Sequence, residues 1–447
     1  AAYNAYLRGR QLQARRTSSD LEKAMAEFTR ATKLDPEYAL AWVGLAETAW
    51  LMMGYGTLPY AESTEIQGLA IEKALAINPD LGEAHASLGL RLSNMGRNEE
   101  AEAAYLKAIE QSPNYATAYH WYAGFLENFP TRLDEALEMI EKAVELDPLS
   151  SIIQTTLARL YVQMGRFEEA ESFYKRISEL DPEFIANYTN LAMLYSDSVG
   201  RFAEALKYLR IAERKDPGNV QVIWIQAYIH LNLGDYEAAE AVRQKQADID
   251  PNNFFLGFTD TAMNLYKDNA AGAREAAEWT LSKVSSNSGF RQFFGVIHTL
   301  EGNFERAREL VTQAYPDWED PAKWDEMIRG QAVNACSVAA IFAGAGEQEK
   351  ADQLINRTIE HYDLVKAKLD RAYTVAPLDC WAASGQFEQA MDVLEQQVEN
   401  GFISWWWFNY DTPWWDGIRS EPRFQAAMQS IQHQVAEQRR LMEEMNL

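Results

Sequence analysis

Cysteine and histidine are scarce in this chain. Only two of its 447 residues are cysteine, and successive members of its six histidines are more than 30 residues apart. Small disulfide-stapled folds need more cysteines, and zinc sites usually place their ligands a few residues apart on one turn or helix. The scarcity therefore excludes a cysteine framework, and we expect no metal site.

Two interpretations remain open for the cysteines themselves, Cys336 and Cys380. They form either one disulfide or two packed free thiols in neighbouring elements near the end of the chain. We favour the free thiols, and this interpretation leaves the redox compartment undecided.

Long apolar runs and positive charge are lacking as well. No stretch approaches the 18 uncharged apolar residues of a spanning helix, so we expect no membrane insertion by this segment. With 41 Lys and Arg against 66 Asp and Glu, the net charge is −25, which repels phosphate backbones, so we expect no direct contact with nucleic acid. Because the chain opens at Ala1 without a Met or a signal-like run, we expect an excised segment or a processed product.

The residue patterns that carry catalysis are also missing. We find no phosphate-cradling glycine loop, no nucleophile elbow and no His-Glu metal helix. Carboxylates are abundant, but no pattern isolates one of them as a general acid. The sequence therefore predicts a protein without catalytic activity and without a cofactor.

A regular spacing of prolines is what the sequence does contain. Seven prolines are separated by 43, 34, 35, 34, 35 and 34 residues: Pro36, Pro79, Pro113, Pro148, Pro182, Pro217 and Pro251. Each closes a unit of fixed pattern, shown most fully by Gly89, Gly96, Ala101, Tyr105, Ala108 and Pro113. Small residues let two antiparallel helices approach closely, glycine ends the first helix, and proline stops the second.

This pattern resembles the tetratricopeptide repeat, whose period is 34 residues. The resemblance implies an all-α fold, a right-handed superhelical solenoid of about eleven helical hairpins with a C-terminal capping segment. We expect regular repeats over residues 1–251, divergent repeats over 252–400, and a Trp-rich loop with a capping helix over 401–447. The turn-rich residues 315–323 predict a joint at which the repeats bend or loosen.

The Trp-rich loop contains Trp405, Trp406, Trp407, Trp414 and Trp415, close to Phe408, Tyr410 and Pro413. A terminal repeat has no neighbour on one side and needs a distinct cap. We therefore expect these aromatic residues to seal the last repeat. A platform for a ligand or a partner surface is the alternative.

The resemblance also implies a working surface, because the first helix of each repeat lines the concave side of such solenoids. The positions that should face inward and form a peptide-binding groove include His120, Glu127, Asn128, Arg159, Asp197, Trp224, Tyr228 and Asn232. Aromatic, amide and single charged groups together suit an extended peptide or a helix. For each residue alone, a solvated or packing role remains the alternative.

Four segments resemble a narrower group of proteins. They are YLRGR at residues 6–10, KLDPEYALAW at 33–42, YATAYHWY at 115–122 and DGIRSEPRF at 416–424. They are similar to the C-terminal repeat regions of bacterial CadC-like winged-helix regulators and of adenylate-cyclase-like signalling proteins with TolB-like segments. This resemblance implies a sensory scaffold on the periplasmic side of a membrane-anchored protein, although a cytoplasmic location is possible.

We therefore expect a non-enzymatic interaction domain that binds a protein or peptide partner and relays that state to an output domain. A self-associating scaffold, in which the Trp-rich tail docks onto another copy, is one alternative. A small-molecule-binding sensor is the other.

Overall fold

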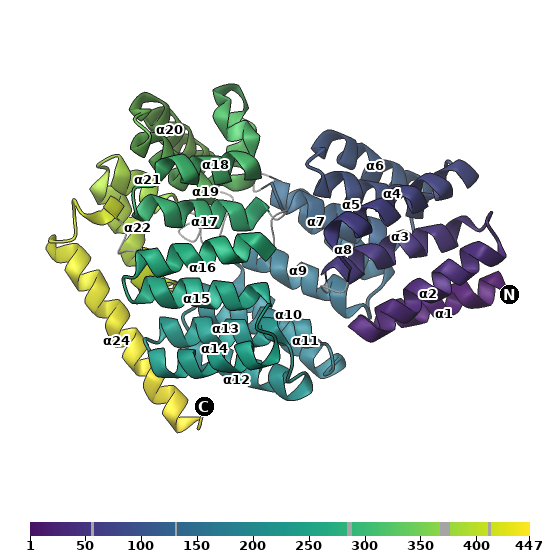
Figure 1. The fold of residues 1–447 in the computed structure, drawn as a ribbon, viewed down its shortest axis with the longest axis horizontal. Helices are drawn as coiled ribbons and strands as arrows, with labels where there is room; N and C mark the ends of the chain where they lie inside the picture. Colours follow the sequence, from purple (N-terminus) through teal and green to yellow (C-terminus); the bar gives the residue numbers. More distant parts are fainter. Residues whose placement is uncertain (55–57, 130–131, 284–287, 367–375, 410–412) are drawn as a thin grey trace. The chain divides into compact units, whose positions relative to one another are not determined.

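The computed structural model describes residues 1–54, 58–129, 132–283, 288–366, 376–409 and 413–447, and over these ranges the chain is helical without any strand. It divides into two compact units, Ala1–Leu157 (unit 1) and Ala158–Leu447 (unit 2). In unit 1, four helical hairpins follow one another (Figure 1): α1 Ala2–Arg15 with α2 Ser18–Leu34, α3 Ala39–Gly54 with α4 Tyr60–Ile77, α5 Gly82–Asn94 with α6 Asn98–Gln111, and α7 Ala116–Leu126 with α8 Leu133–Leu146. Helix α9, Ser151–Gln163, crosses the boundary between the units.

Unit 2 continues the succession of hairpins. Its elements are α10 Phe167–Leu180; α11 Ile185–Met193, extended by the π-helix η2 Leu194–Ser198, with α12 Phe202–Lys215; α13 Val220–Asn232 with α14 Tyr236–Ile249; α15 Phe254–Tyr266 with α16 Ala270–Lys283; α17 Ser288–Leu300 with α18 Phe304–Ala314; α19 Trp324–Gly344 with α20 Gln348–Val365; and α21 Leu378–Ala383 with α22 Phe387–Glu399. The all-α fold and the helical hairpins predicted from the proline spacing are confirmed.

The repeat residues act as their spacing predicts. A Cβ atom on Gly89 would lie 2.7 Å from the Tyr105 ring, so only glycine lets α5 approach α6 this closely. Gly96 follows α5 with a φ of 73°, a left-handed conformation that glycine adopts without strain. Glycine therefore sets both the packing distance and the end of the first helix.

The π-helix η2 marks an irregular repeat. In the regular repeats the small packing residue and the turn glycine are seven positions apart, as with Gly89 and Gly96, whereas Ala192 and Gly200 are eight apart. The wider turn of η2 lies between them and accommodates the additional residue. Such one-turn π segments inside α-helices are frequent at functional sites.

The segment between α18 and α19 is compact, so the expectation that the repeats loosen at residues 315–323 is wrong, whereas a bend at this joint stays a prediction. It forms two 3-10 helices, η3 Pro316–Glu319 and η4 Pro321–Lys323. Trp318 is fully buried, and Glu319 accepts hydrogen bonds from Arg308 at 2.6 Å and from Lys350 at 2.8 Å. Turn-forming residues here start two short helices that pack against the core.

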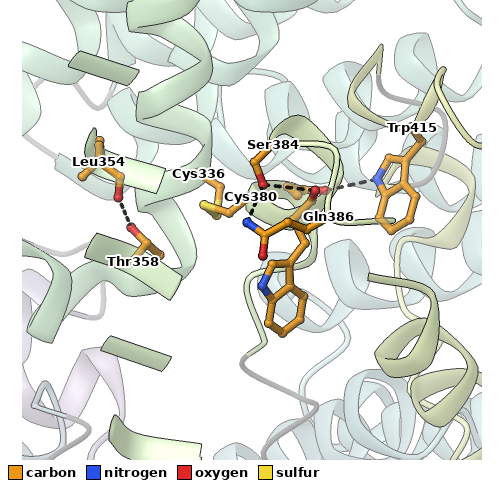
Figure 2. Close-up of a disulfide and its surroundings, with 9 residues drawn as sticks. Cys336, Leu354, Thr358, Cys380, Ser384, Gln386 and Trp415 are labelled. Carbon is orange, nitrogen blue, oxygen red and sulfur yellow. Dashed lines mark hydrogen bonds between the residues drawn. A yellow bond between two sulfur atoms is a disulfide. The ribbon is translucent and has the colours of Figure 1, made fainter. Parts of the chain in front are cut away.

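Cys336 on α19 and Cys380 on α21 form a disulfide (Figure 2), so the preference for free thiols is wrong. Helix α21, which follows the α19–α20 hairpin, contacts α19, and this contact places the Cα atoms of the two cysteines 5.0 Å apart. The sequence does not show this proximity because the cysteines are 44 residues apart. The bond ties the short helix α21 to the core of the preceding repeat.

The described residues after α22 form α23 Trp406–Asn409, the 3-10 helix η7 Pro413–Trp415, and α24 Pro422–Glu444. Within unit 2, α24 passes α22 and continues to α12 (Figure 1). There the Gln438 side chain accepts a hydrogen bond from the Ala203 amide at 3.2 Å, and Arg210 donates to the Asn446 carbonyl at 2.9 Å. The last helix thus fastens the end of unit 2 to an early repeat of the same unit.

Asp379 is a half-buried acid next to Cys380 in the chain, and it accepts a hydrogen bond from the Trp415 indole at 3.2 Å. Burial raises the pKa of Asp379 from 3.8 to about 6. Between these pH values the unfolded chain binds fewer protons than the folded chain, so stability falls as the pH rises through this window and stays lower above it.

Replacing Asp379 with asparagine should remove this penalty while keeping an oxygen for Trp415. A shift of one pKa unit corresponds to about 1.4 kcal/mol, and partial exposure reduces the effect, so we expect the variant to be about 1–2 kcal/mol more stable at pH 7. At pH 3 the two proteins should be equally stable. Urea unfolding at both pH values measures this, and an advantage of equal size at pH 3 would contradict the assignment.

Candidate functional site

Four of the residues predicted to line a groove come together in unit 2. Asp197 lies on η2, and Trp224, Tyr228 and Asn232 lie along α13. The Tyr228 hydroxyl donates to Asp197 Oδ1 at 2.8 Å, and the Trp224 and Tyr228 rings stack with their centroids 6.2 Å apart. The Asn232 amide donates to the Tyr228 carbonyl at 3.1 Å. We call these four residues, together with Tyr266 on α15, the inner groove.

The remaining predicted residues lie elsewhere. His120, Glu127 and Asn128 belong to α7 and its C-terminal end in unit 1, and Arg159 is exposed on α9. His120 Nε2 is 2.9 Å from Thr156 Oγ1, whereas Asn128 donates to two carbonyls at the end of its own helix. Asn128 therefore helps to terminate α7. A binding role for these four residues stays a prediction.

The inner groove holds a segment of the chain itself. Residues Ser404–Trp407, which we call the Trp segment, lie against η2 and α13. The Trp405 amide donates to Asn232 Oδ1 at 2.7 Å, and the Trp406 indole donates to the Asn232 carbonyl at 3.0 Å. Ser404 donates to Asp197 Oδ1 at 3.1 Å and also contacts the Tyr228 hydroxyl. Side chains of the groove thus bind both a backbone N–H and a hydroxyl of an irregular segment.

Ring contacts supply the apolar part of this interaction. The Trp405 ring centroid lies 5.0 Å from that of Tyr228 and 5.3 Å from that of Trp407. The Trp407 ring in turn meets the Tyr266 ring edge-on at 5.3 Å. Trp405 also reaches Phe293 on α17 at 6.4 Å. The Trp segment therefore crosses the first helices of three successive repeats.

Asp197 is the acidic group of the groove, and it is partly removed from water. Burial raises the pKa of Asp197, although hydrogen bonds from Ser196, Tyr228 and Ser404 act in the opposite direction. Burial and the Asp197 charge raise the pKa of the Tyr228 hydroxyl well above its usual value. Tyr228 is therefore a neutral donor at physiological pH, and Asp197 is the natural acceptor for hydroxyl groups.

Two glycines hold the start of the Trp segment. Gly200, after η2, and Gly401 both have positive φ, 64° and 75°. A Cβ atom on Gly200 would lie 2.5 Å from the Gly401 carbonyl oxygen, and a Cβ atom on Gly401 would lie 2.5 Å from the Val199 carbonyl oxygen. Beyond them Ile403 is fully buried. The backbones can meet here only because both positions lack side chains.

The expectation that the aromatic residues seal the last repeat holds for Trp415. Trp415 is fully buried, bonded to Asp379 on α21, and 5.7 Å from the Phe424 ring. Trp405 and Trp407 instead cover repeats that precede the last one, because the chain turns back after α22. The side chains of Phe408, Tyr410 and Pro413 lie outside the described residues.

Sequence reasoning missed Ser404 and the tryptophans as occupants of the groove. Their only signal was the Trp triplet in a segment without repeat periodicity. The groove residues were found because each lies at a fixed offset within its repeat, whereas Ser404 is more than 170 positions from Tyr228. No periodicity can predict such a pairing.

A hollow of about 770 Å³ lies beside α16 and α18 in unit 2. Its charged groups already neutralise one another: Glu278 accepts from Arg306 at 2.9 Å and lies 3.2 Å from His298 Nε2. Burial lowers the pKa of His298, and Arg306 lowers that of Glu278. This pairing leaves little net charge for recognising an ionic ligand.

Among the described side chains, no three histidine, cysteine, aspartate or glutamate residues come together as metal ligands would. Within the same ranges, no helix is both long and apolar enough to cross a bilayer.

Comparison with known families identifies the repeats. Tetratricopeptide repeat models match residues 82–115, 131–194 and 197–254. Repeats of this type are therefore present in unit 1 and in unit 2, as the proline spacing predicts.

Similar proteins share parts of the chain. The human mitochondrial import receptor subunit TOM70 is 29% identical over 180 residues, which are 39% of this chain and 28% of TOM70. Human tetratricopeptide repeat protein 6 is 27% identical over 209 residues, or 47% of this chain and 38% of that protein. The human antiviral innate immune response effector IFIT1 is 27% identical over 316 residues, or 66% and 64%. The chain spans less than two thirds of each relative.

Two solved structures match the chain at low similarity. Pseudomonas aeruginosa PilF is 20% identical with a TM-score of 0.37, over 49% of this chain and 94% of that one. Yeast Tom70 is 13% identical with a TM-score of 0.38, over 98% of this chain and 96% of that one.

Proposed function

We propose that this chain is a non-enzymatic interaction module that binds a protein or peptide along the first helices of its repeats. One observation carries the proposal: the inner groove holds the Trp segment through side chains that bind a backbone N–H and a hydroxyl. Repeat solenoids use such surfaces for partners, and extended segments are recognised through backbone hydrogen bonds combined with pockets for side chains.

We further propose that the module is the sensory part of a larger bacterial signalling or regulatory protein. The support is the resemblance of four segments, YLRGR and DGIRSEPRF among them, to the repeat regions of such proteins. The Cys336–Cys380 disulfide supports a location on the oxidising, extracytoplasmic side of a membrane, because disulfides persist mainly in such compartments. Alkylation of the protein from its native source without reductant should block no cysteine; two blocked cysteines would contradict this location.

Peptide selection on the intact chain tests the binding proposal. Peptides from a displayed random library should bind along the inner faces, so that Asn232→Ala in unit 2 or His120→Ala in unit 1 weakens the selected peptides at least tenfold. Asn232 lies in the groove, whereas Gln221 is exposed at the start of the same helix, so Gln221→Ala is the matched control and should change nothing. Affinities are measured by fluorescence anisotropy.

Circular dichroism should show that each variant is folded. Peptides that bind all variants as they bind the unaltered chain would move recognition to another surface. A library that yields no binder would reject the proposal.

A further inference from the structure

The Trp segment is held in a way that differs from the structural tryptophans of unit 2. Trp318, Trp324 and Trp415 are fully buried, with at most 1% of their surface exposed. Trp405, Trp406 and Trp407 all remain partly exposed. Side chains that complete a core are removed from water, so the Trp segment lies on the groove as a bound surface segment does.

The groove residues hold one another in place. Tyr228 is held by Asp197, and Asn232 is held by the Tyr228 carbonyl. These hydrogen bonds join groove residues to one another, so the acceptors for a backbone N–H and a hydroxyl are held by the groove as well as by the segment. Preorganisation of this kind lowers the entropic cost of binding.

The segment itself carries strain. Trp405 has a φ of 57°, in the left-handed region that residues other than glycine rarely adopt. Asp197, which accepts the hydrogen bond from the Ser404 hydroxyl, lies on the π-helix η2. Left-handed residues other than glycine and single π turns are both concentrated at ligand sites and switches. The chain just before the segment, at Gly401 and Ile403, is fixed by close backbone packing and full burial.

We infer that the inner groove is a recognition site for peptides in which tryptophans follow a hydroxyl residue one and three positions later. The Trp segment, with Ser404, Trp405 and Trp407, occupies this site in cis as a built-in ligand. The inference rests on the proposed function and names the partner chemistry of that same surface. The hydroxyl binds Asp197, the next backbone N–H binds Asn232, and the two indole rings pack beside Tyr228 and Tyr266. A partner peptide of this chemistry must displace the cis segment.

The cis arrangement has a quantitative consequence. A tethered ligand acts at an effective concentration in the millimolar range, so a cis segment of micromolar intrinsic affinity weakens every competing peptide by a large factor. Removing the cis side chains should therefore strengthen binding in trans. We expect at least a tenfold gain.

The probe is a fluorescein-labelled peptide with the sequence of residues 400–409, added to the intact chain and to the Trp405→Ala, Trp407→Ala double variant. The variant should bind the peptide at least tenfold more tightly than the unaltered chain. Adding Tyr228→Phe, which removes the groove hydroxyl but keeps the ring, should reverse most of the gain. Trp279→Ala, a partly exposed tryptophan on α16, is the matched control and should leave binding unchanged.

A control on the peptide leaves the protein untouched. Methylation of the backbone nitrogen at the position of Trp405 removes the N–H that Asn232 accepts, and should weaken binding at least tenfold. Equal binding of methylated and unmethylated peptides, or equal binding by the unaltered chain and the folded double variant, overturns the inference.

If the double variant does not fold, hydrogen exchange on the unaltered chain decides. The Trp405 amide should exchange through a local opening, faster than the amides of α13 and α15. Exchange of Trp405 only together with those helices would make the segment a fixed part of the core and would overturn the inference.

Light scattering distinguishes the source of the occupant. A single-copy mass at all concentrations agrees with docking in cis. A doubled mass that the Trp405→Ala, Trp407→Ala double variant abolishes would assign the occupant to a second copy and overturn the cis arrangement.

The peptide experiments separate this inference from the proposed function. If library peptides bind the first helices of the repeats but the 400–409 peptide does not, the proposed function stands and this inference fails. If neither binds, both fail.

Discussion

Trp324→Ala is expected to lower the free energy of unfolding by about 3–5 kcal/mol, the usual cost of removing a large aromatic side chain from a core. Trp324 is fully buried at the start of α19. Its indole donates to the Trp318 carbonyl at 2.8 Å, and its ring stacks on Phe342 at 6.3 Å. The substitution leaves a cavity and an unpaired carbonyl in the same place.

Urea unfolding followed by circular dichroism measures the loss. Trp279→Ala removes an equally large but partly exposed ring and should cost less than half as much. Because repeats contact mainly their neighbours, exchange rates should rise around α18 to α20 and change little in unit 1. A loss below about 1 kcal/mol for Trp324→Ala would show that the core collapses onto the vacated volume.

Reduction of the Cys336–Cys380 disulfide is the second large effect. Closing a loop of 44 residues restricts the unfolded chain, and the entropic model gives a stabilisation of about 4 kcal/mol. We expect reductant, or the Cys336→Ser, Cys380→Ser double variant, to lower the unfolding midpoint accordingly. The change should concentrate around α21, where the disulfide and the Trp415 bond to Asp379 hold a helix of only six residues.

The double variant provides the control for this experiment. Reductant should not alter its midpoint, because it has no bond to break. If reductant leaves the unaltered chain equally stable, packing alone holds α21 and the disulfide is energetically redundant.

The fold followed from the sequence because its determinants are local. Gly89 and Tyr105 are 16 positions apart, and the same offset recurs in other repeats, so one rule places many contacts. Asp197, Tyr228 and Asn232 were identified in the same way, since each has a fixed offset from a small packing residue. Their use as a partner site remains a prediction.

The features that the sequence did not reveal depend on single long-range contacts. Cys336 and Cys380 form a disulfide because the α19–α20 hairpin brings α21 beside α19. Ser404 bonds to Asp197 because the chain reverses direction after α22. Residues 315–323 look like a loose joint in composition, yet Trp318 makes them part of the core. In each case the decisive partner lies in another repeat, beyond the reach of local patterns.

The additional residue between Ala192 and Gly200 suggests how such a surface can arise from a uniform repeat. An insertion of one residue into a helix would ordinarily turn every later side chain by about 100° and disrupt the contacts that follow. Here the π turn absorbs it: α12 keeps its packing, and only the short stretch holding Asp197 is redirected. A duplicated scaffold can thus acquire an individual polar group by lengthening one turn, without redesign of its neighbours. Repeats whose length differs by one residue are accordingly the places to look for acquired specificity in chains of this kind.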